Sequence, residues 1–350
     1  KQKTAYEIRL SLVGSEMCIR DRSYTVLARR YRSRSFDELV GQEGIAQTLR
    51  NAIELGRVAH AYLFCGTRGV GKTSTARIFA KALNAPNDEP KDVAEAIMAG
   101  RDTDVIEIDG ASNNSVEDAR DLIAKCIYRP LRGRYKIYII DEVHMLSTAA
   151  FNALLKTMEE PPDHVVFILC TTETHKVPAT IQSRCQRFEF RNIPTPKIVE
   201  HLTAVVEQEK LKATPELLHS VARLGNGSMR DALSLMDRLM ASGEKKLTIE
   251  LLQDLIGLPD KDIVAGLVNA LGEADVSTAL KKTAELLGRG VSPEQLLGTL
   301  ADRFRDLMII NACGTDTDLV ELSGELRQVA IEQATKFDVA GLVHMIALCE

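Results

Sequence analysis

The chain has 350 residues, of which 45% are hydrophobic, 27% are charged and none is tryptophan. A chain of this length predicts two or three domains with room for a real core. Its longest apolar run, Val165–Cys170, is six residues long, whereas a membrane-spanning helix needs about 18, so no membrane span is expected. The net charge of −5 excludes a bulk nucleic-acid binder, and any contact with DNA must come from a local patch.

The seven cysteines form no recognisable metal-binding pattern. The two closest in sequence lie 15 residues apart, which excludes a CxxC motif and zinc-ligand spacing. An odd number of cysteines, several of them in apolar runs, is typical of reduced thiols in a cytoplasmic protein. Residues 1–22 have neither the apolar core nor the cleavage site of a signal peptide. We expect them to be a non-native leader rather than a terminal arm of the fold.

From Ser23 onward, short strands alternate with helical patterns. The five predicted strands are Ala61–Cys65, Asp104–Asp109, Lys136–Asp141, Val165–Thr171 and Cys185–Phe190. The predicted helices between them are Lys72–Leu83, Val116–Tyr128, which opens on a Ser115–Asp118 capping box, and Thr148–Glu159. This alternation predicts a parallel sheet with helices on both faces, over residues 23–193.

After Phe190 the pattern contains no convincing strand. Thr195, Thr214 and Ser292 each precede a proline, as a capping residue does before the first helical position. Residues 194–257 are therefore predicted to form a small domain of three or four helices, and residues 258–350 a second all-helical domain. The helical pattern Phe337–Cys349 runs to the end of the chain, so we expect this last domain to be truncated.

A glycine-rich phosphate loop follows the first predicted strand. Residues 66–73 match G-x-x-x-x-G-K-[ST] between a strand and a helix, which is the context that this motif requires. Backbone N–H groups of such a loop, together with the start of the helix, bind phosphate oxygens. Lys72 would reach the β- and γ-phosphates, and Thr73 would ligate Mg²⁺. The predicted nucleotide-binding residues here are Gly66, Thr67, Arg68, Gly69, Val70, Gly71, Lys72, Thr73 and Ser74.

Two further strands end in polar residues that suit hydrolysis. The third strand ends at Asp141 and Glu142. Asp141 would hold Mg²⁺, and Glu142 would act as general base toward water. The alternative is a solvated acidic turn, but a carboxylate pair here favours hydrolysis over transfer to a substrate hydroxyl. Thr172 ends the next strand at the same level, where it can orient water or simply terminate the strand.

Together these residues resemble the clamp-loader ATPases of the AAA+ class, specifically the gamma/tau family of bacterial DNA polymerase III. The resemblance covers Ser23 to Glu350 and rests on the phrases VLARRYR, GTRGVGKTSTARIFAKALN, EIDGASNNSVEDARDL, IYIIDEVHMLSTAAFNALLKTMEEPP and IQSRCQRFEF. It implies an α/β P-loop AAA+ domain with a five-stranded parallel sheet. It further implies that residues 194–257 are a helical lid and residues 258–350 an all-α collar used for oligomerisation.

The resemblance also implies roles for single residues. Thr172 corresponds to sensor 1, and Arg230, in the phrase GSMRDA, to sensor 2. Arg184, in the phrase SRC, corresponds to the arginine finger, which acts in trans on ATP bound by the adjacent subunit. The alternative for each arginine is a surface salt bridge. The segments that frame adenine correspond to Ala28–Tyr31 and Val40–Gln42, with Ala28, Tyr31, Val40 and Gly41 as the predicted contacts.

The implied function is that of a motor in DNA replication. With delta- and delta-prime-type subunits and copies of itself, such a chain would bind ATP and Mg²⁺, open the sliding clamp and close it on primer–template DNA. DNA contacts are expected near residues 112–114. The sequence departs from the family pattern in two places: Ser33 stands where proline is common, and residues 84–103 lack the usual four cysteines, so no zinc is predicted.

Two other functions remain open from the sequence. One is a different AAA+ DNA remodelling ATPase, such as a branch-migration motor, although that would need a winged domain with a hairpin in the C-terminal third. The other is a non-catalytic scaffold subunit of the clamp loader, although that would lack a working phosphate loop.

Overall fold

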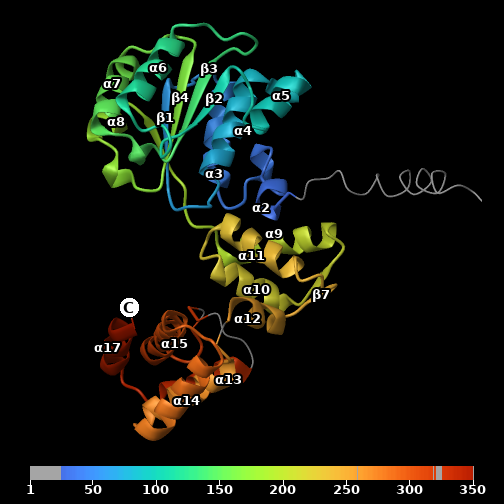
Figure 1. Ribbon diagram of the computed structural model, residues 1–350, viewed down its shortest axis with the longest axis vertical. Helices are drawn as coiled ribbons and strands as arrows, with labels where there is room; N and C mark the ends of the chain where they lie inside the picture. Colours follow the sequence, from blue (N-terminus) through green and yellow to red (C-terminus); the bar gives the residue numbers. More distant parts are fainter. Residues whose placement is uncertain (1–24, 258, 318, 321–324, 350) are drawn as a thin grey trace, which may run out of the picture. The chain divides into compact units, whose positions relative to one another are not determined.

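The computed structural model describes residues 25–257, 259–317, 319–320 and 325–349, so the predicted leader lies outside the described residues. The chain divides into two compact units, residues 1–247 and 248–350 (Figure 1). This division falls ten residues before the boundary predicted after residue 257. Within the described ranges, no helix is both long and apolar enough to cross a membrane.

The first unit contains the predicted parallel sheet. Its strands lie in the order β2-β3-β4-β1-β5. Their bounds are β1 (Ala61–Cys65), β2 (Val105–Asp109), β3 (Lys136–Asp141), β4 (Val165–Thr171) and β5 (Gln186–Glu189). Cys65 pairs with Thr171, and Ile140 with Leu169, so the carboxyl ends of β1, β3 and β4 meet at one edge. Ligands of open parallel sheets bind at this edge.

Helices cover both faces of the sheet, as predicted (Figure 1). On one face lie α3 (Glu43–Glu54), α4 (Lys72–Asn84) and α5 (Lys91–Met98), and on the other lie α6 (Val116–Cys126), α7 (Thr148–Glu159) and α8 (Ala179–Gln182). Successive strand residues point to opposite faces. Tyr62 and Phe64 of β1 therefore join the core beneath α3–α5, and Leu63 and Cys65 join the core beneath α6–α8.

Most of the predicted helix starts are confirmed. Ser115 and Asp118 form a reciprocal capping box on α6, and the side chain of Thr214 accepts the N–H of Leu217 at the start of α10 (Pro215–Leu224). The prediction for Thr195 is wrong: α9 (Thr195–Gln208) includes this residue, and Pro194 takes the capping position without a side-chain hydrogen bond. Pro196 consequently occupies the second position of α9, within the first turn where proline is tolerated.

The small helical domain packs against the N-terminal segment of the same unit. It comprises α9, α10 and α11 (Met229–Met240), and α2 (Leu27–Arg30) contacts α11. Leu27 is buried, and its N–H donates to Asp237 Oδ1 at 3.2 Å. The expectation of no strand after Phe190 is wrong, because β6 (Lys212–Ala213) and β7 (Lys246–Leu247) pair in parallel. Two-residue strands are too short to produce an alternating pattern.

Asp104 fixes the loop that leads into β3. Its carboxylate accepts the backbone N–H groups of Leu131, Arg132 and Gly133 at 2.7–2.9 Å and lies 3.5 Å from Lys136 Nζ. Burial acts against the charged form, but these hydrogen bonds and Lys136 outweigh it, so the pKa of Asp104 is lowered.

The second unit is helical throughout its described residues, as predicted. Its helices are α12 (Ile249–Ile256), α13 (Lys261–Gly272), α14 (Val276–Gly288), α15 (Pro293–Cys313), α16 (Glu325–Ala334) and α17 (Val339–Cys349). Ser292 caps α15 in a capping box with Gln295, as its sequence predicts. The buried Gln333 accepts two hydrogen bonds from Arg303 and donates to the carbonyl oxygen of Ala265 at 2.9 Å. This polar contact ties α16 to α15 and α13.

Candidate nucleotide-binding site

The phosphate loop joins β1 to α4 and is held closed by Lys72. The Lys72 ammonium donates to the carbonyl oxygens of Gly66 and Thr67, both at 2.8 Å. Gly71 takes the left-handed conformation, with φ 103°, at the N-cap of α4. The N–H groups of a first helical turn have no intrahelical acceptor, so this end of α4 suits an anion. Burial lowers the pKa of Lys72, and a bound polyanion would favour its charged form.

The loop meets the acidic end of β3 through a hydroxyl–carboxylate contact. Thr73 Oγ1 donates to Asp141 Oδ2 at 2.7 Å. Both are hard oxygen ligands of the kind that Mg²⁺ takes alongside water and substrate phosphates. Among the described residues, no group of three or more His, Cys, Asp and Glu side chains is arranged to hold a metal. Thr73 and Asp141 therefore fit an ion that completes its coordination with phosphate and water.

Glu142 has an unusual backbone conformation at the end of β3. Its φ and ψ are both 46°, a left-handed conformation that is uncommon for residues other than glycine. Such conformations cluster at active sites, where the surrounding structure holds them. The Glu142 N–H donates to Asp141 Oδ1 at 3.1 Å, and Thr172 Oγ1 donates to Glu142 Oε2 at 3.1 Å. The contact between Glu142 and Thr172 joins two of the predicted catalytic residues.

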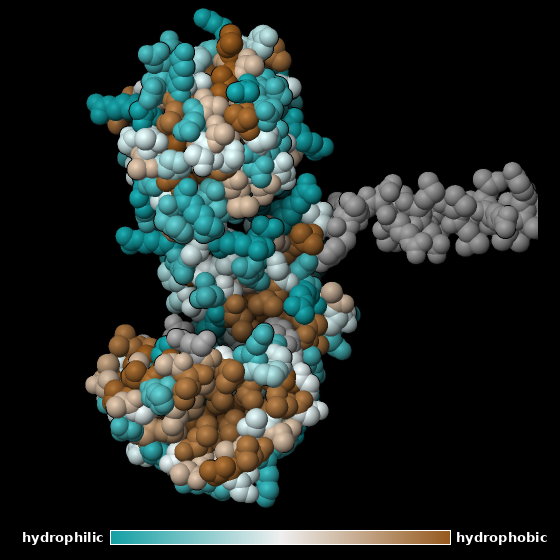
Figure 2. Space-filling model, turned by 60° about the vertical axis from the view of Figure 1, so that its left-hand side comes forward, coloured by the Kyte–Doolittle hydropathy of each residue, from teal (hydrophilic) through white to brown (hydrophobic). Residues whose placement is uncertain are grey.

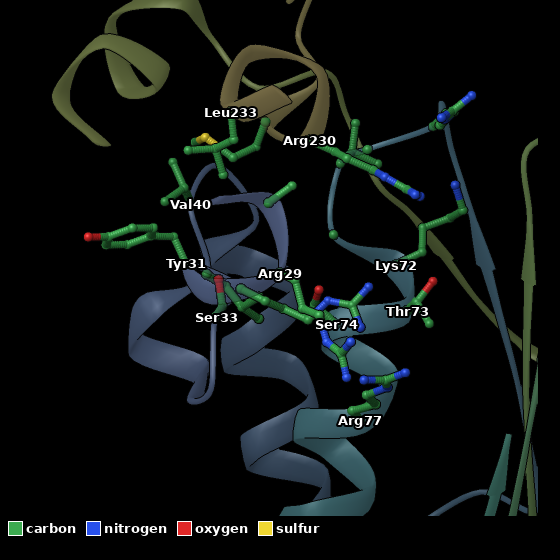
Figure 3. A pocket seen from close by; sticks show the side chains of 18 of the residues that line it. Arg29, Tyr31, Ser33, Val40, Lys72, Thr73, Ser74, Arg77, Arg230 and Leu233 are labelled. Atoms are coloured by element: carbon green, nitrogen blue, oxygen red, sulfur yellow. The ribbon is translucent and has the colours of Figure 1, made fainter. Parts of the chain in front are cut away.

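A cavity of about 420 Å³ opens over the loop (Figure 3). The predicted binding residues that line it are Ala28, Tyr31, Val40, Arg68, Gly69, Val70, Gly71, Lys72, Thr73 and Ser74. Three others, Gly41, Gly66 and Thr67, do not line it. In Figure 3 the Tyr31 ring is directed away from Lys72. Its hydroxyl donates a hydrogen bond to Glu209, the residue that follows α9.

The lining of this cavity is strongly basic. Only two acidic side chains line it, Asp141 and Glu142. The six basic side chains in the lining are Arg29, Arg32, Arg68, Lys72, Arg77 and Arg230. Arg77 is neutralised in part by a bidentate pair with Glu107 at 2.7 and 2.8 Å. Burial lowers the pKa of Arg32, and the nearby Arg77 acts in the same direction. An excess of guanidinium groups in a partly desolvated pocket favours a polyanionic ligand.

The other two predicted arginines lie in different places. Arg230 belongs to α11 and lines the cavity. Its backbone nitrogen lies 3.5 Å from the carbonyl oxygen of Gly69. Figure 3 shows Arg230 and Lys72 on the same side of the pocket. Arg184 does not line the cavity. It follows α8, and its guanidinium contacts Glu159 at the end of α7. A single chain therefore does not bring Arg184 to its own phosphate loop.

Comparison with known families gives three adjoining matches. Residues 41–194 match the family model "DNA polymerase III, delta subunit", and residues 197–245 match "DNA polymerase III clamp loader subunit, ATPase lid domain". Residues 247–346 match "DNA polymerase III subunits gamma and tau domain III". The matches cover both units of the chain.

Curated relatives agree with these models. The chain is 38% identical to DNA polymerase III subunit gamma of Buchnera aphidicola, over 79% of this chain and 78% of that protein. The chain belongs to the gamma/tau family of DNA polymerase III subunits. It is also 44% identical to subunit tau of Bacillus subtilis and 42% identical to subunit tau of Escherichia coli, over 89% and 88% of this chain. Those matches cover 55% and 49% of the two tau subunits, so the chain spans about half of their length.

Among solved structures, the chain resembles a RuvB variant of Thermotoga maritima. The TM-score is 0.51 at 19% identity, over 70% of this chain and 80% of RuvB. A second RuvB structure from Thermotoga maritima, described as a Holliday junction branch migration motor, gives a TM-score of 0.50 at 19% identity. At this identity the likeness shows the AAA+ fold alone, and it does not support the branch-migration alternative for this gamma/tau family member.

Sequence reasoning missed several residues of the pocket in this gamma/tau chain. Arg77 lies four residues after Thr73 and therefore on the same face of α4, a signal that was available. Arg32 follows the predicted adenine segment directly, in the basic first 34 residues. Met229 and Leu233 of α11 also line the cavity. They reach it only because the helical lid packs over the loop, which no local pattern indicates.

Proposed function

We propose that this chain is an ATP-hydrolysing motor subunit of a replicative clamp loader. The observation that carries the proposal is the contact of Thr73 with Asp141, with Glu142 beside it, under a basic cavity lined by Arg230. One pocket brings together the phosphate loop, the acidic end of β3 and Arg230 of the lid, as hydrolysis of a nucleoside triphosphate requires. The buried thiols Cys65, Cys126 and Cys170 are free, which supports a cytoplasmic site of action.

Each residue has a distinct task in the proposed reaction. The start of α4 and Lys72 bind the β- and γ-phosphates, and Arg230 binds the γ-phosphate from the lid. Thr73 and Asp141 would hold Mg²⁺, which neutralises phosphate charge when it is bound. Glu142 accepts a proton from the attacking water while Thr172 holds the other carboxylate oxygen. The predicted adenine side of the pocket consists of Ala28, Tyr31 and Val40, while Gly41 packs against Ile193 instead.

Arg184 would complete the site of the adjacent subunit. Its position outside the cavity of its own chain supports action in trans. An arginine finger is worth about 10³–10⁵ in rate, so the chain alone would hydrolyse ATP slowly. The proposed partners are delta- and delta-prime-type subunits and further copies of this chain, acting on the sliding clamp and primer–template DNA.

The second unit supports assembly. Figure 2 shows hydrophobic side chains gathered on its visible face. Large apolar side chains that are exposed in this unit include Val276, Leu280, Leu287, Leu297, Leu319, Val339, Val343 and Leu348. Extended apolar patches mark protein–protein contacts, which agrees with an oligomerisation collar. The DNA contact expected near residues 112–114 stays a prediction; the carboxylate of Asp118, which caps the start of α6, would disfavour a phosphate at that helix start.

The alternative of a non-catalytic scaffold subunit is disfavoured by the complete set of Lys72, Thr73, Asp141 and Glu142. Two substitutions test the proposal. Lys72→Ala should abolish ATP binding, because the pocket loses the cation that contacts the terminal phosphates. Glu142→Gln should bind ATP with unchanged affinity and hydrolyse it at least about 100-fold more slowly, since general-base catalysis contributes 10²–10⁴.

The assay is ATP turnover by the chain assembled with its partner subunits, sliding clamp and primed DNA, with affinity measured separately on the chain alone. Glu160→Gln is the matched control, because Glu160 is an exposed carboxylate at the end of α7. Normal turnover of the Glu142→Gln variant would refute the assignment of the base. Retained affinity in the Lys72→Ala variant would remove Lys72 from the site.

A further inference from the structure

A buried histidine lies against Glu142. His144 stands two residues after Glu142, and its side chain is only 6% exposed. Its Nδ1 lies 3.1 Å from Thr171 Oγ1 and 3.5 Å from Glu142 Oε2. Its Nε2 lies 3.3 Å from Glu173 Oε1. The imidazole ring therefore fills the space between the proposed general base and the turn that follows β4.

The neighbouring hydrogen bonds fix the orientation of this ring. A carboxylate can only accept hydrogen bonds, so Nε2 carries a hydrogen toward Glu173. Thr171 Oγ1 accepts the N–H of Glu173 at 3.0 Å, which leaves the hydroxyl hydrogen of Thr171 free to reach His144 Nδ1. Each of three residues thus contacts the other two: Glu173, Thr171 and His144. Glu173 is itself held by Lys176 at 2.8 Å.

The two oxygens of Glu142 differ as a result. Oε2 accepts a hydrogen bond from the Thr172 hydroxyl at 3.1 Å, and the His144 ring packs beside it, with Nδ1 at 3.5 Å. Oε1 has no hydrogen-bond partner among the residues that the structure describes. If His144 were small, the Glu142 side chain could turn into the vacated space, because only one hydroxyl would hold it.

We propose that His144 is a positioning residue for the reaction of the proposed function, on which this inference rests. The edge of its ring occupies the space beside Glu142 Oε2 and so keeps this oxygen against Thr172, which leaves Oε1 as the oxygen presented to the attacking water. Through Nε2 it is anchored to Glu173, outside the nucleotide cavity. His144 does not line the nucleotide cavity, so its contribution lies in orientation, to which hydrolysis rates are sensitive.

Two amide substitutions separate the functions of the two ring nitrogens. The amide of His144→Asn falls near the position of Nδ1, where it can still contact Thr171 and fill the space beside Glu142. The amide of His144→Gln reaches the position of Nε2 and can still contact Glu173, but it leaves the Nδ1 position empty. His175→Asn is the matched control, since His175 also lies near Glu173, at 3.7 Å, but its side chain is 76% exposed.

The measurements are kcat and KM for ATP in the assembled complex, ATP affinity of the chain alone, and melting temperature. We expect His144→Gln to lower kcat at least about 10-fold with unchanged affinity, and His144→Asn to stay within about threefold of the parent chain. His175→Asn should behave as the parent chain. Equal losses in the Asn and Gln variants, or no loss in either, would overturn the proposal.

A second pair of variants covers the case in which a His144 variant does not fold. Glu173→Ala removes the anchor at Nε2 and should lower kcat severalfold, whereas Glu173→Gln retains an acceptor and should not. In the double variant with His144→Gln, the loss should equal that of His144→Gln alone, because Glu173 acts only by anchoring the imidazole ring, which that variant no longer has. Multiplied losses would overturn the proposal. Absence of turnover in the parent complex would instead refute the proposed function itself.

Discussion

Substitution of Gly69 by alanine should damage the contact between the phosphate loop and the lid. Gly69 has a φ of +77°, and a Cβ added there would lie 1.9 Å from Ser228 Oγ and 3.0 Å from Ser228 Cβ. Ser228 is the N-cap of α11, where its side chain accepts the N–H of Asp231 at 3.2 Å. The new methyl group therefore displaces the residue that starts the helix carrying Arg230.

The cost has two parts. A non-glycine residue in the left-handed conformation costs about 1–2 kcal/mol, and loss of a serine N-cap costs about 1 kcal/mol. We expect Gly69→Ala to destabilise the first unit by about 2–3 kcal/mol. Ser228→Gly alone should cost only a few tenths of a kcal/mol, because glycine is an acceptable N-cap. In the double variant the clash with the Ser228 side chain is gone, so about 1 kcal/mol should be recovered relative to the sum of the single effects.

Urea unfolding followed by circular dichroism measures these values. The two units can unfold separately, so the transition to analyse is the one that added nucleotide shifts to higher urea. The second readout is ATP affinity, which should fall in Gly69→Ala and recover partly in the double variant. If the double variant is destabilised by the full sum of its two single effects, the clash with Ser228 is not the cause and the reasoning fails.

Three further predictions concern other parts of the chain. Arg184→Ala should lower hydrolysis by about 10³-fold or more in the assembled complex and leave ATP affinity of the lone chain unchanged; an equal loss of turnover in the lone chain would show action in cis. Asp104→Asn should destabilise the first unit by about 1–3 kcal/mol. Because the pKa of Asp104 is lowered in the folded state, its stabilisation is complete above the ordinary Asp pKa of about 4 and is lost as pH falls through the lowered value. Urea unfolding between neutral and acidic pH should show a larger loss of stability in the parent chain than in the variant, in which only the other carboxylates with lowered pKa contribute to the loss. Gln333→Leu should destabilise the second unit by about 2–3 kcal/mol, since Arg303 loses its buried acceptor, while ATP affinity stays unchanged; a shifted affinity would contradict this separation of the units.

The sheet and the phosphate loop were predictable because their signals are local. A buried strand such as β4 is a continuous apolar run, and the motif ending in Lys72 and Thr73 sits directly between strand and helix. Parallel strands bring their carboxyl ends to one edge, so the meeting of Thr73, Asp141 and Thr172 followed from element order. The misplaced cap at Thr195 and the missed strands β6 and β7 concern features of one or two residues, for which local patterns carry little information.

The sequence by itself determined the phosphate loop, the acidic strand end and the succession of one α/β domain and two helical ones. Each depends on residues close together in the chain, where sterics and hydrophobic period act directly. Only the tertiary structure decided that Arg32 and Leu233 share a cavity with Lys72, and that His144 packs against Glu142. These contacts depend on how the lid, α2 and the turn after β4 pack together, and packing of side chains from distant segments leaves no pattern in any one of them.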